Sequence, residues 1–504
     1  MLRLLPPALA LAILLPSPAL AQEPSTAAPS AAAPSTAAPS TPAPTAEPLS
    51  LKAAVSEALD GNLGLLAARY DALLAQDSAA MAAAGYEPQL TASVRRSTDF
   101  IRNSGDLVDL GVPFASTIGS IGVTQPIPGG GTASLSYSEV LFDDKSDSNP
   151  YGDTAALIVD VRQPLLSGAI LGGRERSLAD ATFGLGDAEL DLHTVVADLI
   201  LEIEGAYWGL VQAGQAVTAG ELSLASASHQ EAWVQERIDL GFDPPSELLA
   251  TQERVASAQA AMASATAERA NAEARLLYLL GRDLRAARPL LQPTTAPEAF
   301  DVLEAEAAQA AAFDRNLETR ALRRAVLTAR RSLRFTVIDQ LPSLDASLSV
   351  RPDLAADGTP WTVGLSMSTP LPSRGRVHGI LAARARVAQS EVRLKSAQQR
   401  LRLLVETATR AVDTAGAQVR LAEVGLDVAQ RKFEAEGERL SRGRSTNKTV
   451  LDYLEDRDQA VRNRNNSLVA LAQAAAQLRR LTGTNLEFWG VDPSALIQRR
   501  KELR

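Results

Sequence analysis

The chain has 504 residues, a formal net charge of −9, no cysteine and an aromatic content of only 4%. Without cysteine, disulfide staples and a lipid anchor on cysteine are both excluded. The chain is mildly acidic, and its lysines and arginines are dispersed along helical segments. Both features argue against binding to nucleic acid.

The amino terminus has the features of a secretory signal. Arg3 supplies positive charge, residues 4–15 form an apolar run, and residues 19–21 read Ala-Leu-Ala, a small-x-small cleavage site. A membrane anchor is the alternative, but it needs roughly 20 apolar residues, and Pro6, Pro7 and Pro16 make it less favourable. We expect residues 1–21 to be a signal peptide and residues 22–47, almost entirely Ala, Pro, Ser and Thr, to be a disordered leader.

Two segments, 49–83 and 300–335, have helical periodicity and end shortly before Pro88 and Pro342. After each proline, apolar residues recur at every second position, which predicts strands with one apolar and one polar face. A half-buried sheet of a soluble domain would show this pattern. A membrane barrel would show it too, with apolar side chains toward lipid and polar ones toward a wet lumen. The export signal, and the lack of a later apolar run long enough to span as a helix, favour the barrel.

The strand region of the first repeat is longer than that of the second by about 48 residues. The additional residues, at about 100–150, contain the turn signal Gly129-Gly130-Gly131 between two alternating segments. They predict an additional hairpin. The sequence leaves open whether this hairpin adds strands to the wall or only lengthens the extracellular end.

Two very long Ala-rich helical patterns follow the strands, and each bends at a Glu-Arg-x-x-x-Gly stretch that ends at Gly241 or Gly443. Glycine just past a helix is the usual left-handed cap, so each stretch predicts the tip of a helical hairpin. The two tips are 202 residues apart, and so are the ends of the returning helices, Gly281 and Gly483. This constant period predicts two copies of one unit. A helix of about 70 residues reaches on the order of 100 Å, which no globular domain requires.

With these features the chain resembles the TolC-type outer-membrane efflux proteins, the channel-tunnels of Gram-negative bacteria. The resemblance covers about residues 49–484. It rests on the duplicated plan, on Gln-Pro-Leu-Leu at 163–166, on Gly-Ala-Tyr-Trp at 205–208, and on the helical returns at 246–250 and 449–452.

The resemblance implies an α+β membrane protein, internally duplicated, whose long antiparallel helices form a coiled-coil barrel joined to a transmembrane β-barrel. Three identical chains share this barrel, and each contributes four strands. The implied divisions are a first outer-membrane efflux repeat at 48–282, a second at 299–484 and a C-terminal tail at 485–504.

The implied function is a passive exit duct in the outer membrane, with its helical tunnel in the periplasm. Such a duct serves a tripartite efflux pump or a type I secretion system. Its implied partners are outer-membrane lipid, a periplasmic adaptor (membrane fusion protein) that docks on the helical tips, and an inner-membrane pump or ABC exporter. Docking of the adaptor would open the duct.

The resemblance also assigns roles to residues at the tips. Docking contacts are implied at Arg237, Gly241, Phe242, Glu247, Leu248, Arg439, Gly443, Ser445, Thr446, Val450 and Leu451. Members of the family can carry two acidic residues just inside the second tip, which narrow the closed entrance. Here Asp452 matches the second of these positions, whereas Thr449 stands at the first, so a single periplasmic gate ring is implied. The ordinary alternative for Asp452 is a solvated carboxylate near a helix start.

Two other protein classes compete with the duct. A periplasmic adaptor or scaffold would carry one coiled-coil hairpin between the halves of a small β domain, whereas this chain has two hairpins, each preceded by strands. An exported enzyme would need a constellation of catalytic residues. The three histidines, His193, His229 and His378, are isolated, and no phosphate-binding glycine loop occurs. We therefore expect no enzyme, no cofactor and no metal site.

Overall fold

The computed structural model describes residues 47–101, 112–142, 154–170, 172–241, 244–285, 291–295, 305–352, 359–369, 374–442, 444–445 and 447–497. The predicted signal peptide and almost all of the predicted leader lie outside these residues. The helices are α1 (Leu51–Gly61), α2 (Leu63–Ala84), α3 (Ser167–Ile170), α4 (Gly173–Asp239), α5 (Ser246–Leu280), α6 (Ala305–Arg315), α7 (Leu317–Ile338), α8 (Arg374–Ser441), α9 (Asn447–Thr482), α10 (Asn485–Phe488) and α11 (Pro493–Ile497). The strands are β1 (Glu47–Leu49), β2 (Gln89–Ile101), β3 (Val112–Ile127), β4 (Gly131–Phe142), β5 (Thr154–Pro164), β6 (Leu291–Pro293), β7 (Ser343–Val350) and β8 (Trp361–Ser368).

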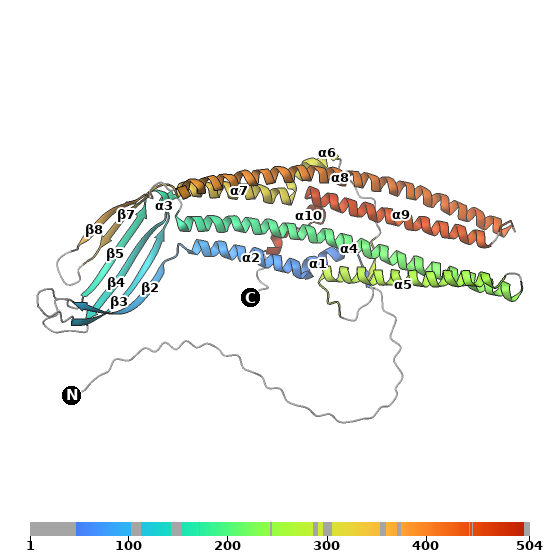
Figure 1. Cartoon of the computed structure of the whole chain (residues 1–504), viewed down its shortest axis with the longest axis horizontal. Coiled ribbons are helices and arrows are strands. Elements are labelled where there is room, and N and C mark those ends of the chain that lie inside the picture. The colour runs from blue at the N-terminus through green and yellow to red at the C-terminus, as the bar shows by residue number, and fades with distance from the viewer. Residues whose placement is uncertain are drawn as a thin grey trace, which may run out of the picture. The chain divides into compact units, whose positions relative to one another are not determined.

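Long helices dominate the body formed by residues 46–504 (Figure 1). Helices α4 and α8 have 67 and 68 residues, so each extends on the order of 100 Å. Helices α5 and α9 return along the halves of α4 and α8 that lie farther from the sheet. The shorter α2 and α7 pack along the halves of α4 and α8 that lie nearer the sheet. Four helices therefore lie side by side both near the sheet and far from it. Next to the sheet their order is α2, α4, α7, α8. Among the described helices, none is both long and apolar enough to cross a membrane.

Equivalent asparagines show that the two repeats fold alike. Asn62 caps α2 and Asn316 caps α7, and each side chain accepts a hydrogen bond from the backbone N–H three residues later. The side-chain amide of Asn62 donates to the carbonyl of Leu279, and that of Asn316 donates to the carbonyl of Leu481, both at 2.9 Å. Each repeat thus ties the start of its short helix to the end of its returning helix.

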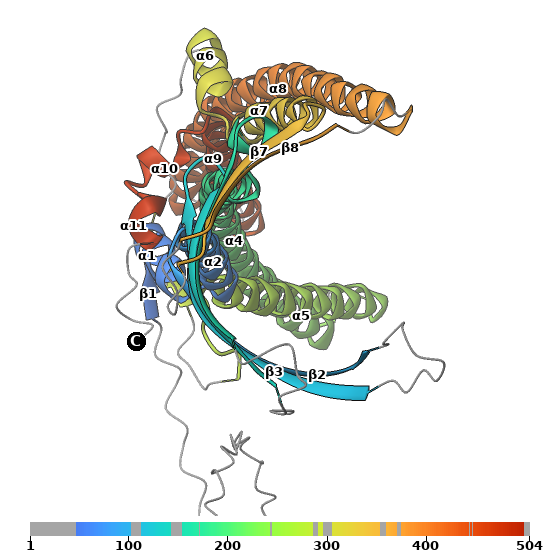
Figure 2. The same ribbon diagram turned by 90° about the vertical axis from the view of Figure 1, so that its left-hand side faces the viewer.

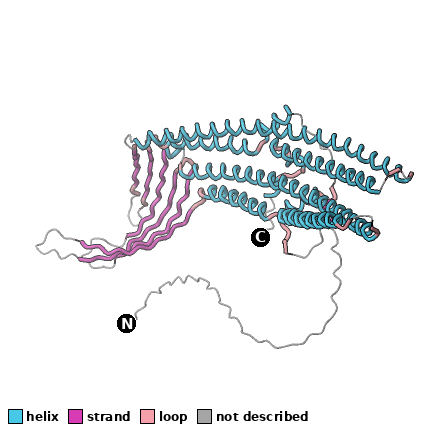
Figure 3. The backbone as a smooth tube through the Cα atoms, turned by 45° about the vertical axis from the view of Figure 1, so that its right-hand side comes forward, coloured by secondary structure: helices cyan, strands magenta, loops and turns pink. Residues whose placement is uncertain are grey.

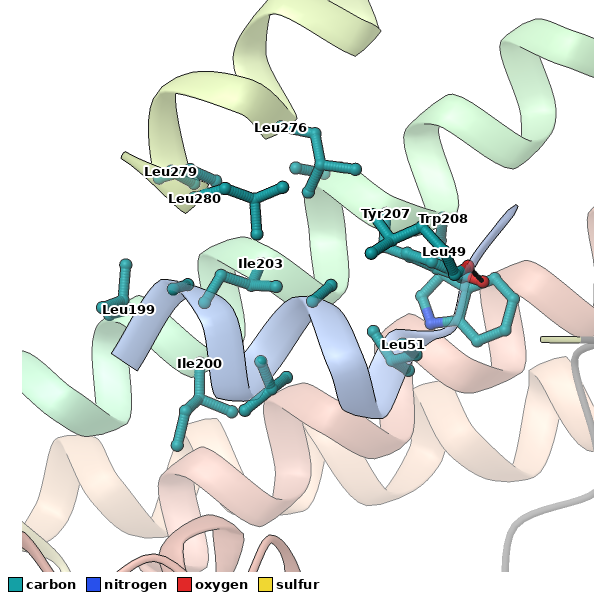
Figure 4. Packing of buried hydrophobic residues seen from close by; sticks show 14 of the residues in the cluster. Leu49, Leu51, Leu199, Ile200, Ile203, Tyr207, Trp208, Leu276, Leu279 and Leu280 are labelled. Carbon is teal, nitrogen blue, oxygen red and sulfur yellow. Dashed lines mark hydrogen bonds between the residues drawn. The ribbon is translucent and has the colours of Figure 1, made fainter. Parts of the chain in front are cut away.

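The main apolar core lies where these helices meet in the middle of the body (Figure 4). Tyr207 and Trp208 of α4 are fully buried there. The Tyr207 hydroxyl donates to the carbonyl of Leu49 at 3.0 Å and accepts from the N–H of Thr295 at 2.9 Å. These bonds fix a small parallel sheet of β1 and β6 against α4. Tyr207 and Trp208 therefore pack the core and do not form a ligand platform.

The larger sheet has six strands in the order β2-β3-β4-β5-β7-β8, all antiparallel to their neighbours. It joins the helices at one end and is strongly curved (Figures 2 and 3). The predicted additional hairpin is β3–β4, and it lies inside the sheet between β2 and β5. This sheet therefore has six strands, where the resemblance implies four from each chain. The register shows that the hairpin adds two strands to the sheet and does not project from its end.

One face of this sheet is more apolar than the other, and the difference extends across all six strands. Residues paired directly across adjacent strands lie on the same face. One such row is apolar and consists of Leu90, Val123, Leu135, Val159, Val350 and Trp361. The adjacent row on the opposite face is polar and consists of Gln89, Thr124, Ser134, Asp160, Ser349 and Thr362. The predicted alternation therefore aligns in register across all six strands.

Candidate functional site: the two helical tips

The first tip joins α4 to α5. Gly241 follows the end of α4 with a φ of +77°, in the left-handed region, and its N–H donates to the carbonyl of Ile238 at 2.9 Å. A side chain would be strained in this conformation, which explains the glycine. The predicted tip residue is thus confirmed as a left-handed cap. Phe242 lies outside the described residues.

Aromatic and apolar side chains are exposed on this tip. The guanidinium of Arg237 stacks over the ring of Trp233, 4.8 Å from its centroid, and the Trp233 side chain stays about half exposed. Leu240 and Leu249 are 64% and 69% exposed on either side of the turn. The sequence prediction included Arg237 but missed Trp233. A tryptophan four residues before an arginine on one helix was the available signal.

The start of α5 carries the other two predicted contacts of the first tip. Glu247 is exposed in the first turn of α5, where a negative charge is favourable for the helix dipole. Leu248 is half-buried beside it. Arg237, Gly241 and this helix start belong to one short turn, so the structure brings together the predicted residues of the first tip that it describes.

The second tip is organised by Glu436, which the sequence prediction missed. This residue of α8 is only 7% exposed. Its carboxylate accepts a hydrogen bond from the Ser445 hydroxyl at 2.5 Å and forms an ion pair with Arg439 at 3.3 Å. Two predicted contacts, Arg439 and Ser445, are therefore held by the same carboxylate. Gly443 and Thr446 lie outside the described residues.

Aligning the two repeats in the sequence would have singled out Glu436. At the repeat spacing of 202 residues, the equivalent position of the first tip is Val234, which is also 7% exposed. A buried valine in one copy and a buried carboxylate in the other indicate that the second tip requires a hydrogen-bond acceptor there. Buried carboxylates need such partners, because an unpaired one is costly.

The remaining predicted residues lie in the first turns of α9. Val450 is half-buried and Asp452 is exposed, while Leu451 lies between them in the helix. Thr449 lies in the same helix, about one turn before Asp452. In the described part of the chain, no three His, Cys, Asp or Glu side chains gather as a metal ion would require.

The sequence pattern of the family described as outer membrane efflux protein matches residues 54–282 and 311–484. The chain belongs to this family. The two matched segments correspond to the two repeats, and each segment contains one helical tip. Members of the family are channels of the outer membrane that act in efflux, so the match favours a channel over both the periplasmic adaptor and the exported enzyme.

Solved structures of bacterial outer-membrane proteins have the same fold as this efflux protein. CmeC of Campylobacter jejuni is 15% identical with a TM-score of 0.66, and the match covers 89% of this chain and 88% of that one. The open state of MtrE of Neisseria gonorrhoeae is 16% identical with a TM-score of 0.60, covering 86% and 89%. VceC of Vibrio cholerae is 14% identical with a TM-score of 0.60, covering 86% and 96%. No curated protein sequence matches the chain.

The carboxylate of Glu436 makes a testable contribution to the second tip of this efflux protein. Glu436→Ala should loosen the turn, because Ser445 and Arg439 lose their shared partner, at a local cost of about 1–3 kcal/mol. Trypsin should then cut after Arg442 or Arg444 several-fold faster than in the parent. Glu434→Ala, two residues earlier on an exposed position, is the matched control. Equal cleavage rates in the two variants would contradict the role of Glu436.

Proposed function

We propose that three copies of this chain form the passive exit duct of a tripartite efflux pump or a type I secretion system. The observation that carries this proposal is the joining of two helical hairpins, on the order of 100 Å long, to a curved sheet with one apolar and one polar face. Each feature alone also occurs in proteins of different function. Their combination in one chain suits a tube that crosses a membrane and continues beyond it.

The sheet would form the membrane wall. Its apolar rows would face lipid and its polar rows a water-filled lumen, the arrangement found in transmembrane barrels. A barrel must close so that no backbone groups stay unpaired in lipid. A single curved sheet of six strands leaves two edges to be paired, so closure requires further copies of the chain.

The helices would form the periplasmic tunnel. The side chains of Leu421 and Val424 on α8 are 72% and 63% exposed, although both are large and apolar. They form a second apolar stripe beside the buried stripe that includes Val412 and Val419. A helix with two such stripes can pack on neighbours at both sides and so close into a cylinder.

The tips would be the docking surface for the adaptor. The exposed Trp233, Leu240 and Leu249 give the first tip an apolar surface far from the sheet. Three copies would present three first and three second tips around the tunnel entrance. The chain has no phosphate-binding glycine loop, so the energy for export would come from the inner-membrane partner.

Asp452 would form the gate ring. Three copies of one exposed carboxylate around a narrow axis would repel each other and would favour cations at the entrance. Thr449 stands at the first of the two acidic positions that related channels can carry, so this gate would have three charges in place of six.

Cell fractionation tests the proposed function. The full-length protein, expressed in a Gram-negative host, should sediment with the outer membrane. It should also require detergent for extraction and migrate as a heat-modifiable trimer. Recovery as a soluble periplasmic monomer would contradict the duct and would favour the adaptor or scaffold.

A further inference from the structure

The inserted hairpin β3–β4 is built into the middle of the sheet. Its strands pair with β2 on one side and with β5 on the other over most of their length. Val123 and Leu135 of the hairpin continue the apolar row, and Thr124 and Ser134 continue the polar row. A loop folded over the sheet, or a hairpin projecting from its end, would not match both faces in register.

The turn of this hairpin is anchored to the base of α4. One carboxylate oxygen of Glu175 accepts from the N–H groups of both Gly129 and Gly130, each at 2.9 Å. Gln163 donates to the carbonyl of Gly129 at 3.0 Å. A Cβ on Gly130 would also collide with the carbonyl of Gly168, so the turn fits closely against the junction of strand and helix. The hairpin is thus held at the helical end of the sheet.

At an ordinary strand tilt, six strands also fit the width of the helical layer next to the sheet. Four helices of each chain, α2, α4, α7 and α8, lie side by side next to the sheet and span about 32–40 Å at ordinary helix spacing. Six strands, about 4.8 Å apart and tilted by about 40°, span about 37 Å along the wall. Four strands would span only about 25 Å. Six strands therefore match the arc of helices that they continue.

We propose that the barrel formed by three copies of this efflux protein has eighteen strands, six from each chain, and that β8 of each copy pairs with β2 of the next. This inference rests on the proposed trimer. In the described sheet, β2 and β8 each pair on one side only. They run antiparallel to each other, because five antiparallel pairings separate them, so a second copy can extend the same antiparallel order.

The consequence is a wider exit than four strands per chain would give. A barrel of eighteen strands has a backbone diameter of about 36 Å, against about 24 Å for twelve. Barrels of 16–18 strands leave an aqueous channel. The lumen would be lined by hydroxyl-bearing side chains such as Ser93, Ser120 and Ser138, which face one another across β2, β3 and β4. A wide polar lumen suits bulky hydrophilic cargo.

Electron cryo-microscopy of the full-length trimer in lipid nanodiscs tests the proposal. A cross-section of the membrane wall should show eighteen strands. Twelve strands, with β3–β4 outside the wall, would overturn the inference and leave the proposed duct intact. A protein that does not form a membrane trimer would overturn both.

A deletion variant gives a second measurement. Removing residues 102–153 and joining β2 to β5 through a short turn leaves an antiparallel pair, because the deleted segment contains two whole strands. This variant should form a trimer with twelve strands, and its open barrel should exclude neutral polymers that enter the wild-type barrel. Removal of residues 24–46, which leaves every described strand in place, is the control. An unchanged polymer cut-off in the assembled hairpin deletion would contradict the proposal.

Discussion

Leu248→Glu and Val450→Glu should each abolish most export while leaving the trimer assembled. Both side chains are half-buried at the starts of the returning helices, one at each tip. An unpaired carboxylate in a docking interface costs about 2–5 kcal/mol. Since every 1.4 kcal/mol is a factor of ten, adaptor affinity should fall at least about 25-fold. Export of a fluorescent efflux dye from cells that depend on this duct is the measurement.

Conservative changes at the same positions isolate the effect of charge. Leu248→Met and Val450→Ile keep the apolar character and should export as the parent does. Heat-modifiable trimer, measured in the outer membrane for every variant, separates lost docking from lost assembly. Normal export by both glutamate variants would show that the adaptor does not dock on these tips.

Glu204→Ala should lower the free energy of unfolding by about 3–5 kcal/mol, because it leaves a charged partner without its carboxylate in the core. Glu204 of α4 is 2% exposed. It accepts from the guanidinium of Arg479 in α9 at 3.0 Å and from the indole N–H of Trp489 at 2.6 Å. It thus joins the first repeat to the second and to the C-terminal segment. Urea unfolding followed by far-ultraviolet circular dichroism is the measurement, and Glu202→Ala, at an exposed position two residues earlier, should change little.

The same carboxylate predicts a pH dependence. Burial raises the pKa of Glu204 above its ordinary value of 4.5, although Arg479 and Trp489 oppose the shift. Because the folded protein then holds this proton more tightly than the unfolded chain does, its contribution to stability is lost as the pH rises from 4.5 through the raised pKa. The stability of the wild type relative to Glu204→Gln should therefore decline over that interval. A difference that stays constant, or that grows with pH, would contradict the raised pKa.

Much of the fold was predictable because its signals are local. The periodicity of the helices, with Gly241 at the first tip and Gly281 after the returning helix, marks where these helices end, and both glycines have the left-handed conformation that is common after a helix. The repeat spacing then carries each assignment from one half of the chain to the other. For the same reason the tip residues Arg237 and Arg439 could be located before the structure was known.

The features that were missed depend on partners distant in sequence. Strands β1 and β6 have three residues each and pair across more than 240 positions, so neither has a local pattern. The C-terminal tail resembles a loose end, yet Asn485 donates to the carbonyl of Ala197 and Trp489 reaches Glu204. The strand count was also open, because alternation predicts strands but does not show which strand pairs with which.

Accessibility of single cysteines tests the account most directly, because the natural chain has no cysteine and therefore no background. Ser146→Cys places a thiol in the connection between β4 and β5, and Arg444→Cys places one at the exposed second tip. A maleimide on a large polyethylene glycol cannot cross the outer membrane. We predict that it labels Ser146→Cys in intact cells and labels Arg444→Cys only after the outer membrane is opened. If both positions stay unlabelled until the membrane is opened, the chain does not cross it, and the proposed duct is wrong.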